Sequence, residues 1–184
     1  MKFLKMQSKK AAHLLTSVLS ICLTFVSCAQ PPANRAHAEN PEFDKKISRM
    51  ISFSVPTMSV QELKNQPKDI VILDAREYEE FAVSHIPNAR YVGYDAFDAD
   101  KLSAISKDSK IVLYCSIGYR SEKIGEKLMK MGYTDVHNLY GSIFEWVNQG
   151  NEVIDASGQP TQLIHTYNEK WSQWMKNADM KKTW

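Results

Sequence analysis

A cysteine followed five positions later by an arginine is the part of this sequence best suited to chemistry. Cys115 comes directly after four strand-forming residues, 111–114, and residues 119–131 have the periodicity of a helix. A loop this short must curl before the helix, so several of its backbone N–H groups point at the sulfur. The helix dipole adds positive potential, which lowers a thiol pKa from roughly 8.5 into the range of about 3.5 to 7.5 found in activated thiols. We therefore predict that Cys115 is a nucleophile.

The same residues also fit a buried structural cysteine followed by a turn. The position of Cys115 after the last strand residue, the glycine three residues further on and the arginine entering the helix together favour the chemical interpretation. The loop residues that would bind the substrate are Ser116, Ile117, Gly118, Tyr119 and Arg120.

The pattern Cys115-x-x-Gly118-x-Arg120-Ser121 closely resembles the rhodanese-like sulfurtransferase family. Asp74-Ala75-Arg76 and the segment 84–89, Ser-His-Ile-Pro-Asn-Ala, add to the resemblance, which covers about residues 55 to 150. It implies that Cys115 takes the outer sulfur of a donor such as thiosulfate as a persulfide, and that cyanide, a small thiol or a protein thiol then removes it. It implies no cofactor and no metal.

Loop length separates this chain from other enzymes on the same fold. Related phosphatases of the cell-cycle type and arsenate reductases resemble it but carry five residues between cysteine and arginine, which makes room for a tetrahedral oxyanion. This chain has four. A second hypothesis is a persulfide carrier or sulfur-binding module with little turnover, and it also requires Cys115. Arg120 either contacts an anionic donor or pairs with a carboxylate, and the sequence favours neither.

Two continuous apolar runs, 70–73 and 111–114, are typical of strands buried on both faces, and helical segments lie between them. Further short strands are expected near 55–58, 89–94 and 136–139. We predict an α/β fold of the rhodanese-like type, with a parallel, about five-stranded sheet, helices on both faces and a C-terminal helical extension. The carboxyl ends of its strands share one edge, where such sheets bind ligands.

Supporting roles are predicted for three residues near this edge: Asp74, Arg76 and Ser121. Asp74 and Arg76 either control the electrostatics of the site or form a cap and salt bridge that hold a loop, and we favour the second interpretation. His85 is expected to be a hydrogen-bonded strut rather than a base.

The first 28 residues have the features of a targeting segment, with early lysines and an apolar run from Leu14 to Val26. The run ends in Phe25-Val26-Ser27-Cys28, which resembles the lipobox of bacterial lipoproteins and implies lipidation of Cys28. Ordinary signal cleavage after Ala29 is the competing interpretation. Either predicts an exported protein of the bacterial envelope, anchored to a membrane in the first case and soluble in the second. Cys115 would then be the one free thiol.

The domain organisation follows from changes in composition. We predict a signal segment (1–28), a flexible tether (29–52), a rhodanese-like domain (53–150) and an aromatic helical extension (151–184). In the extension, Leu163, Tyr167, Trp171 and Trp174 recur at helical spacing, either to clamp the domain or to rest on a membrane. The net charge of +2 is mixed rather than gathered in a basic stripe, so no nucleic-acid partner is expected.

Overall fold

The computed structural model describes residues 31–67 and 69–184. The predicted signal segment and Cys28 lie outside the described residues. Within the described ranges, no helix combines the length and the apolar character needed to cross a membrane.

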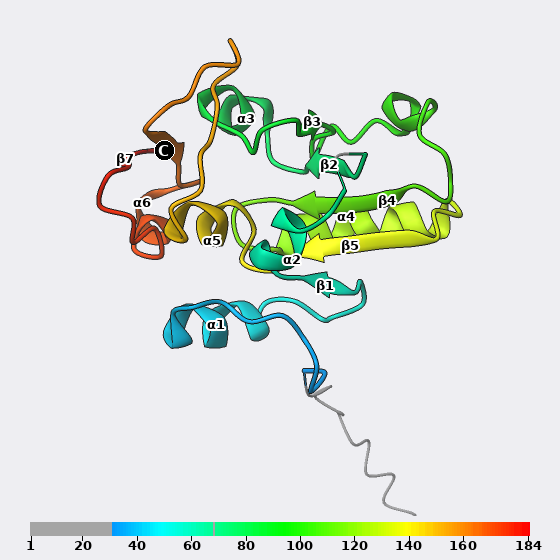
Figure 1. Ribbon diagram of the computed structural model, residues 1–184, viewed down its shortest axis with the longest axis horizontal. Helices are drawn as coiled ribbons and strands as arrows, with labels where there is room; N and C mark the ends of the chain where they lie inside the picture. The colour runs from blue at the N-terminus through cyan, green and yellow to red at the C-terminus, as the bar shows by residue number, and fades with distance from the viewer. Residues whose placement is uncertain (1–30, 68) are drawn as a thin grey trace, which may run out of the picture.

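A single five-stranded sheet forms the centre of the fold (Figure 1), and all of its pairings are parallel. Its strands lie in the order β1-β5-β4-β2-β3. Their bounds are β1 Thr57–Met58, β2 Val71–Asp74, β3 Arg90–Tyr91, β4 Lys110–Tyr114 and β5 Asp135–Leu139. The predicted α/β class and parallel sheet are therefore confirmed. The apolar runs supply the inner strands because both faces of these strands are covered.

Helices cover both faces of the sheet (Figure 1), and the sheet lies between two apolar clusters. The 12-residue helix α4 packs on one face beside η1, and α2 and α5 pack on the other. The helical bounds are α2 Val60–Lys64, α3 Tyr78–Val83, η1 Ala99–Leu102, α4 Tyr119–Lys130 and α5 Ser142–Asn148. Gly125 lets α4 approach closely, because a Cβ there would lie 2.9 Å from Val55 Cγ2.

The predicted tether is wrong for residues 35–52, which pack against the domain. Helix α1, Pro41–Ser48, is capped by Asn40 and buries Phe43 and Ile47 in the main cluster. Arg35 binds Asp44 through both terminal nitrogens and donates to the Tyr140 hydroxyl at 2.6 Å. Prolines and charges suggested a linker, but two apolar side chains one helical turn apart are enough to dock a helix of this length.

The predicted C-terminal helix is also wrong, because residues 151–184 are mostly extended or irregular. They contain β6 Leu163–His165 paired in parallel with β7 Lys181–Thr183, and a single turn, α6 Glu169–Ser172. The backbone of Tyr167 is left-handed, with φ of 67°, which ends any helix running through it. The aromatic spacing therefore reflects contacts made by separate segments.

The tryptophans of the extension lie on the domain. Trp171 and Trp174 pack against the main core cluster, and the Trp174 ring stacks on Phe43 with the ring centres 5.5 Å apart. This supports the clamping interpretation of the C-terminal aromatic residues over the membrane interpretation. The stacking of Trp174 on Phe43 also joins the C-terminal extension to α1.

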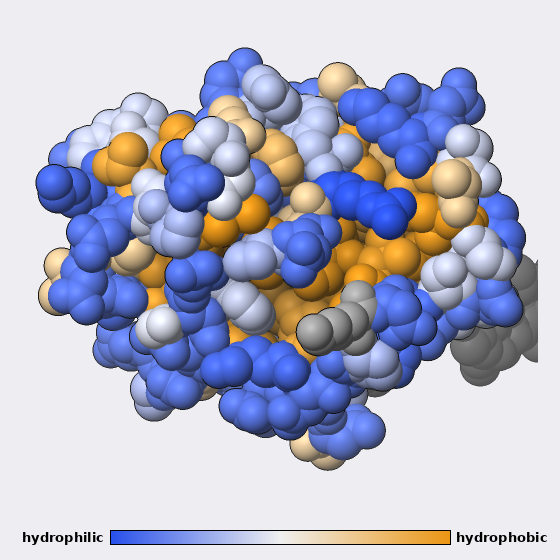
Figure 2. All heavy atoms as spheres, turned by 45° about the horizontal axis from the view of Figure 1, so that its top comes forward, coloured by the Kyte–Doolittle hydropathy of each residue, from blue (hydrophilic) through white to orange (hydrophobic). Residues whose placement is uncertain are grey.

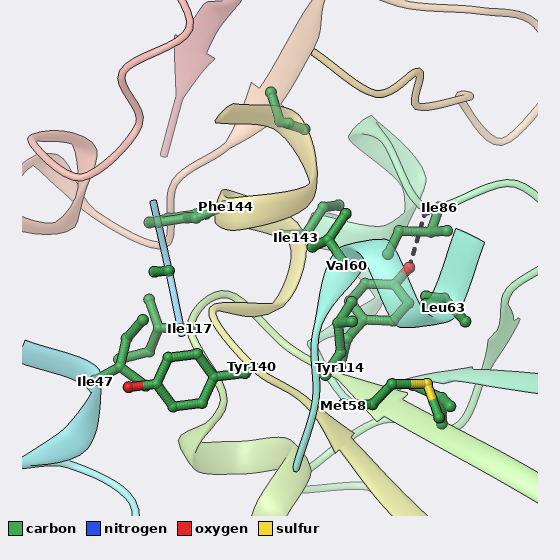
Figure 3. Packing of buried hydrophobic residues seen from close by; sticks show 14 of the residues in the cluster. Ile47, Met58, Val60, Leu63, Ile86, Tyr114, Ile117, Tyr140, Ile143 and Phe144 are labelled. Carbon is green, nitrogen blue, oxygen red and sulfur yellow. Dashed lines mark hydrogen bonds between the residues drawn. The ribbon is translucent and has the colours of Figure 1, made fainter. Parts of the chain in front are cut away.

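The surface is mainly hydrophilic on the face that Figure 2 shows, where the largest apolar area lies in a hollowed band and smaller apolar areas lie elsewhere. The core on the face of the sheet that α2 and α5 cover is closely packed, as Figure 3 shows around Tyr114. The Tyr114 hydroxyl accepts the Ile86 N–H at 3.1 Å, so this large polar side chain is buried with a partner.

Candidate active site

Cys115 follows the middle strand of the sheet, β4, at the carboxyl edge of the sheet. Residues 115–118 form a short loop, and α4 begins at Tyr119. Gly118 has φ of 122°, a conformation that side chains rarely adopt, so the turn depends on glycine. The strand, loop and helix predicted around Cys115 are therefore confirmed.

The sulfur of Cys115 receives hydrogen bonds from the loop and the helix start. The Gly118 N–H lies 3.1 Å from Sγ, and the Ser121 hydroxyl lies 3.6 Å away. The first N–H groups of α4 have no partners within their own helix, so its positive end faces this loop. Ser121 also binds Asn138 Oδ1 at 2.7 Å, which is consistent with its predicted supporting role.

The pKa of the Cys115 thiol is lowered from its ordinary value. Burial acts to raise it, because the side chain is only 2% exposed. The positive charge of Arg120 and the donors from Ser121 and Gly118 outweigh that effect. Cys115 is thus biased toward the thiolate, the reactive form of a thiol.

Arg120 pairs with a carboxylate, which settles one alternative that the sequence left open. Its two terminal nitrogens lie 2.5 and 2.8 Å from the oxygens of Glu80 on α3, and one also lies 3.0 Å from Ser116 Oγ. Burial acts to raise the pKa of Glu80, but Arg120 lowers it overall. The guanidinium is therefore held in one orientation while its charge still acts on Cys115.

Asp74 and Arg76 form a fully buried ion pair with a shortest separation of 2.6 Å. Arg76 also donates to the Ser84 carbonyl at 2.6 Å, so the pair joins the start of α3 to its end. This is the salt bridge that we favoured from the sequence. Because α3 carries Glu80, the pair helps to position the partner of Arg120 without contacting the thiol.

Ser142 was missed from the sequence although it touches the reactive residue's backbone. Its hydroxyl accepts the Cys115 N–H and donates to the Leu139 carbonyl, both at 3.1 Å. Ser142 has φ of 53° and is completely buried. Ser142 lies 27 positions from Cys115 in the sequence, so only the fold shows that its hydroxyl anchors the loop.

Asn138 on β5 was also missed. Its amide donates to the Gly118 carbonyl at 2.9 Å, which fixes the loop from the neighbouring strand. Ile117 anchors the other side of the loop, where Figure 3 shows its side chain near Ile47 and Tyr140. The loop is therefore held by β5, α1 and α5 together.

A cavity of about 380 Å³ opens above Cys115. Ser116, Ile117, Tyr119 and Arg120, all predicted to bind substrate, line it. Gly118 is not part of its wall and instead donates to the sulfur. The two flanking segments also contribute to the wall, through Met50, Tyr167 and Trp171. Apart from the aromatic spacing, nothing in the sequence predicted these three residues.

His85 lies away from this cavity and acts as a strut, as expected. Its Nδ1 lies 3.0 Å from the Phe81 carbonyl, and its ring stacks on that of Phe81. Within residues 31–67 and 69–184, no three His, Cys, Asp or Glu side chains gather in a way that could hold a metal ion.

Comparison with known proteins decides the family. Residues 59–149 match the model of the Rhodanese-like domain. A protein of Allochromatium vinosum named Sulfurtransferase is 33% identical over 91 residues, which cover 50% of this chain and 84% of that protein. This chain belongs to the rhodanese-like family.

Other relatives of this rhodanese-like chain carry a different name. The tRNA uridine(34) hydroxylase of Cronobacter sakazakii is 34% identical over 101 residues, covering 52% of this chain but 28% of that protein. The chain thus spans well under half of the hydroxylases that it matches. A solved structure from Bacillus halodurans is similar to it, with a TM-score of 0.51, 25% identity and coverage of 55% and 78% of the two chains.

Proposed function

We propose that this protein is a sulfurtransferase that carries sulfane sulfur as a persulfide on Cys115. The observation that carries the proposal is the Gly118 N–H 3.1 Å from a thiol whose pKa is lowered, at the foot of a cavity. A polarised donor at this distance stabilises a negatively charged sulfur. The relative named Sulfurtransferase, matched over most of its length, supports the same function.

The reaction proceeds in two displacements. The Cys115 thiolate attacks the outer sulfur of the donor, the donor's own sulfur–sulfur bond breaks, and its electron pair leaves with the donor's remainder. With thiosulfate the leaving group is sulfite, and one proton from solvent completes Cys115–S–SH. An acceptor thiolate or cyanide then attacks the outer sulfur and regenerates the Cys115 thiolate. Oxidation states balance within each exchange, so no redox cofactor is needed.

The site favours sulfur transfer over phosphate chemistry. Four residues separate Cys115 from Arg120, one fewer than in the related phosphatases and arsenate reductases. The Arg120 guanidinium is bound to Glu80 through two nitrogens and is not free to grip a phosphate in the same bidentate way. A single additional sulfur atom makes smaller demands on the loop.

A persulfide carrier with little turnover is the second candidate function, since the buried thiol and its donors would serve storage equally well. Turnover separates the two candidates. The hydroxylases among the relatives suggest a third activity, but the reactive group of this site is a thiol, and we propose sulfur transfer.

The cellular setting that we propose rests on the first 28 residues, which are outside the described part of the chain. Their resemblance to a lipoprotein signal supports export and a lipid anchor on Cys28, with soluble export as the alternative. A Cys28→Ser variant expressed in bacteria distinguishes them: the anchored form moves from the membrane fraction to the soluble fraction, whereas the soluble form does not change.

The experiment that tests the proposed function measures intact mass after incubation with thiosulfate and, separately, with methanethiosulfonate. We expect one added sulfur on the protein and none on Cys115→Ser, followed by its removal with cyanide. Repeated cycles with excess donor and acceptor support the enzyme, and a single transfer supports the carrier. Absence of the added sulfur with both donors would contradict both.

A further inference from the structure

Part of the wall of the cavity above Cys115 comes from outside the part of the chain that matches the family. Met50 precedes residues 59–149, and Tyr167 and Trp171 follow them. These three residues line the same cavity as Cys115. The reactive sulfur is therefore held by the family region, whereas the two flanking segments help to shape the space for the rest of a substrate.

The charges around the cavity disfavour a small anion with two negative charges. Glu77 and Asp95 line it, and Arg120, its lining cation, is already bound to Glu80 through two nitrogens. Lys46 lies 5.3 Å from the centre of the Trp171 ring but does not line the cavity. A dianion approaching the Cys115 thiolate meets repulsion twice as large as a monoanion does at the same distance.

Aromatic and apolar side chains make up much of the remaining wall. Tyr119, Tyr167 and Trp171 are joined by Met50 and Ile117. The Tyr167 side chain is 52% exposed, so a ligand can cover it, and its ring lies 5.2 Å from the Arg120 guanidinium carbon. Such a wall binds a ring or an alkyl group by contact area and stacking, and about 380 Å³ suits a small organic molecule.

Taking these observations together, we propose that the site accepts sulfur from an organic donor: a sulfane-sulfur compound with an aryl or alkyl group and at most one negative charge. Tyr167 and Trp171 are its specificity-determining residues, and Glu77 and Asp95 discriminate against thiosulfate. This inference rests on the proposed function of Cys115 and names the class of donor for the same site.

Benzenethiosulfonate is a suitable probe of this class. The Cys115 thiolate attacks its outer sulfur, the sulfur–sulfur bond breaks, and benzenesulfinate leaves with the electron pair. One proton from solvent completes the persulfide, Cys115–S–SH. Methanethiosulfonate undergoes the same reaction with the same charge but without a ring, and thiosulfate carries two charges and no ring. The three donors therefore separate the contributions of ring and charge.

The experiment measures the rate at which each donor adds one sulfur to the full chain, by intact mass. Each rate is divided by the rate of the same donor with N-acetylcysteine, which removes differences in leaving group. We expect benzenethiosulfonate to exceed methanethiosulfonate by about tenfold, the advantage of covering one ring, and thiosulfate to be slowest.

Variants assign the selectivity to residues. Trp171→Leu and Tyr167→Asn, the latter chosen because asparagine tolerates the left-handed backbone, should each lower the ratio of benzene to methane donor several-fold. Trp184→Leu, at an exposed tryptophan that does not line the cavity, should leave that ratio unchanged. Asp95→Asn should raise the relative rate with thiosulfate, and Glu79→Gln, outside the cavity, should not.

The outcomes distinguish this inference from the proposed function. Equal normalised rates for the three donors would overturn the inference and leave the Cys115 persulfide in place. An aryl preference that survives in both Tyr167→Asn and Trp171→Leu would overturn the assignment of those residues. The ratio of the two donor rates is compared only for a variant whose circular dichroism is near native. If only one of Tyr167→Asn and Trp171→Leu folds, that variant alone is sufficient for the test. Failure of all donors to load Cys115 would reject the proposed function itself.

Discussion

At the residue scale, the pKa of the Cys115 thiol is set by opposing effects. Burial disfavours its charge, and a cation, a serine and a glycine amide favour it. The sequence predicted the glycine and the helix start because their spacing from the cysteine is short. It did not predict Glu80 or Ser142, which lie 35 and 27 positions away and reach the loop only through the packing of the sheet.

The pH dependence of Cys115 should report the charge of Arg120. In the native protein, the rate of alkylation by iodoacetamide should rise with pH around a midpoint below that of an ordinary thiol, because the thiolate forms earlier. Arg120→Met removes the cation and leaves burial, so the midpoint should move to higher pH.

Glu80→Gln is the matched comparison, since it keeps Arg120 and removes the carboxylate bound to it. We expect no upward movement of the midpoint in this variant. Identical pH profiles for the native protein and Arg120→Met would show that Arg120 is structural only. Iodoacetamide is neutral, so its own attraction to the site does not change with these substitutions.

The Ser142 turn predicts an unusual order of stability. Ser142→Ala leaves two buried groups, the Cys115 N–H and the Leu139 carbonyl, without their partner and should cost about 1–3 kcal/mol. Ser142→Gly loses the same bonds but relieves the left-handed backbone, so it should be more stable than the alanine variant by roughly 1 kcal/mol. Urea denaturation of both variants tests this order, which an equally stable Ser142→Ala would contradict.

At the scale of elements, the strands were predictable and the flanking segments were not. Short apolar runs bounded by polar residues identify buried strands whatever surrounds them, as at Val71–Asp74 and Lys110–Tyr114. Helix α1 has a strong cap but only two buried apolar residues, among charges and prolines that are also typical of a linker. Contacts with Arg35, Tyr140 and Trp174 hold this helix in place. Tyr140 and Trp174 are distant from it in the sequence, and irregular chain separates it from Arg35.

The docking of α1 should depend on the charge of Asp44. Burial acts to raise the pKa of Asp44, but hydrogen bonds from Arg35 and Ala38 lower it to about 2. A lowered pKa means that the stability contributed by Asp44 is complete above its unfolded value of 3.8 and is lost as the pH falls through about 2.

Asp44→Asn should therefore destabilise the protein by roughly 2 kcal/mol at pH 7, and the difference from the native protein should shrink between pH 4 and pH 2. Denaturation with urea at pH 7, 4 and 2.5 measures this difference. Asp69→Asn, at an exposed position, is the control and should change stability by less than about 0.5 kcal/mol. A difference for Asp44→Asn that does not vary with pH would contradict the assigned ion pair.

At the scale of the whole molecule, α1 and the C-terminal extension, which are far apart in the sequence, contact each other. The stacking of Trp174 on Phe43 joins the C-terminal extension to α1, and Asn148 of α5 donates to the Trp174 carbonyl at 2.9 Å. The helical prediction for the extension failed because residues of three short segments happened to be spaced like one helix. Periodicity cannot reveal a left-handed residue such as Tyr167 between them.

Trp174→Ala should loosen both flanking segments at once. We expect a loss of about 2–3 kcal/mol and faster hydrogen exchange in α1 as well as in β6 and β7, with the central sheet less affected. Hydrogen exchange followed by mass spectrometry measures each segment separately. Trp184→Ala removes an exposed tryptophan and serves as the control. Faster exchange confined to residues 169–184 would contradict a shared clamp.

The origin of Met50, Tyr167 and Trp171 outside the family region has a consequence for how such proteins diverge. Mutations in these flanking segments can alter which donor enters the cavity without disturbing the loop that holds the sulfur. Two homologues with superimposable sheets could then take sulfur from different donors. Exchanging the flanking segments between homologues is thus a direct way to move donor selectivity from one protein to another.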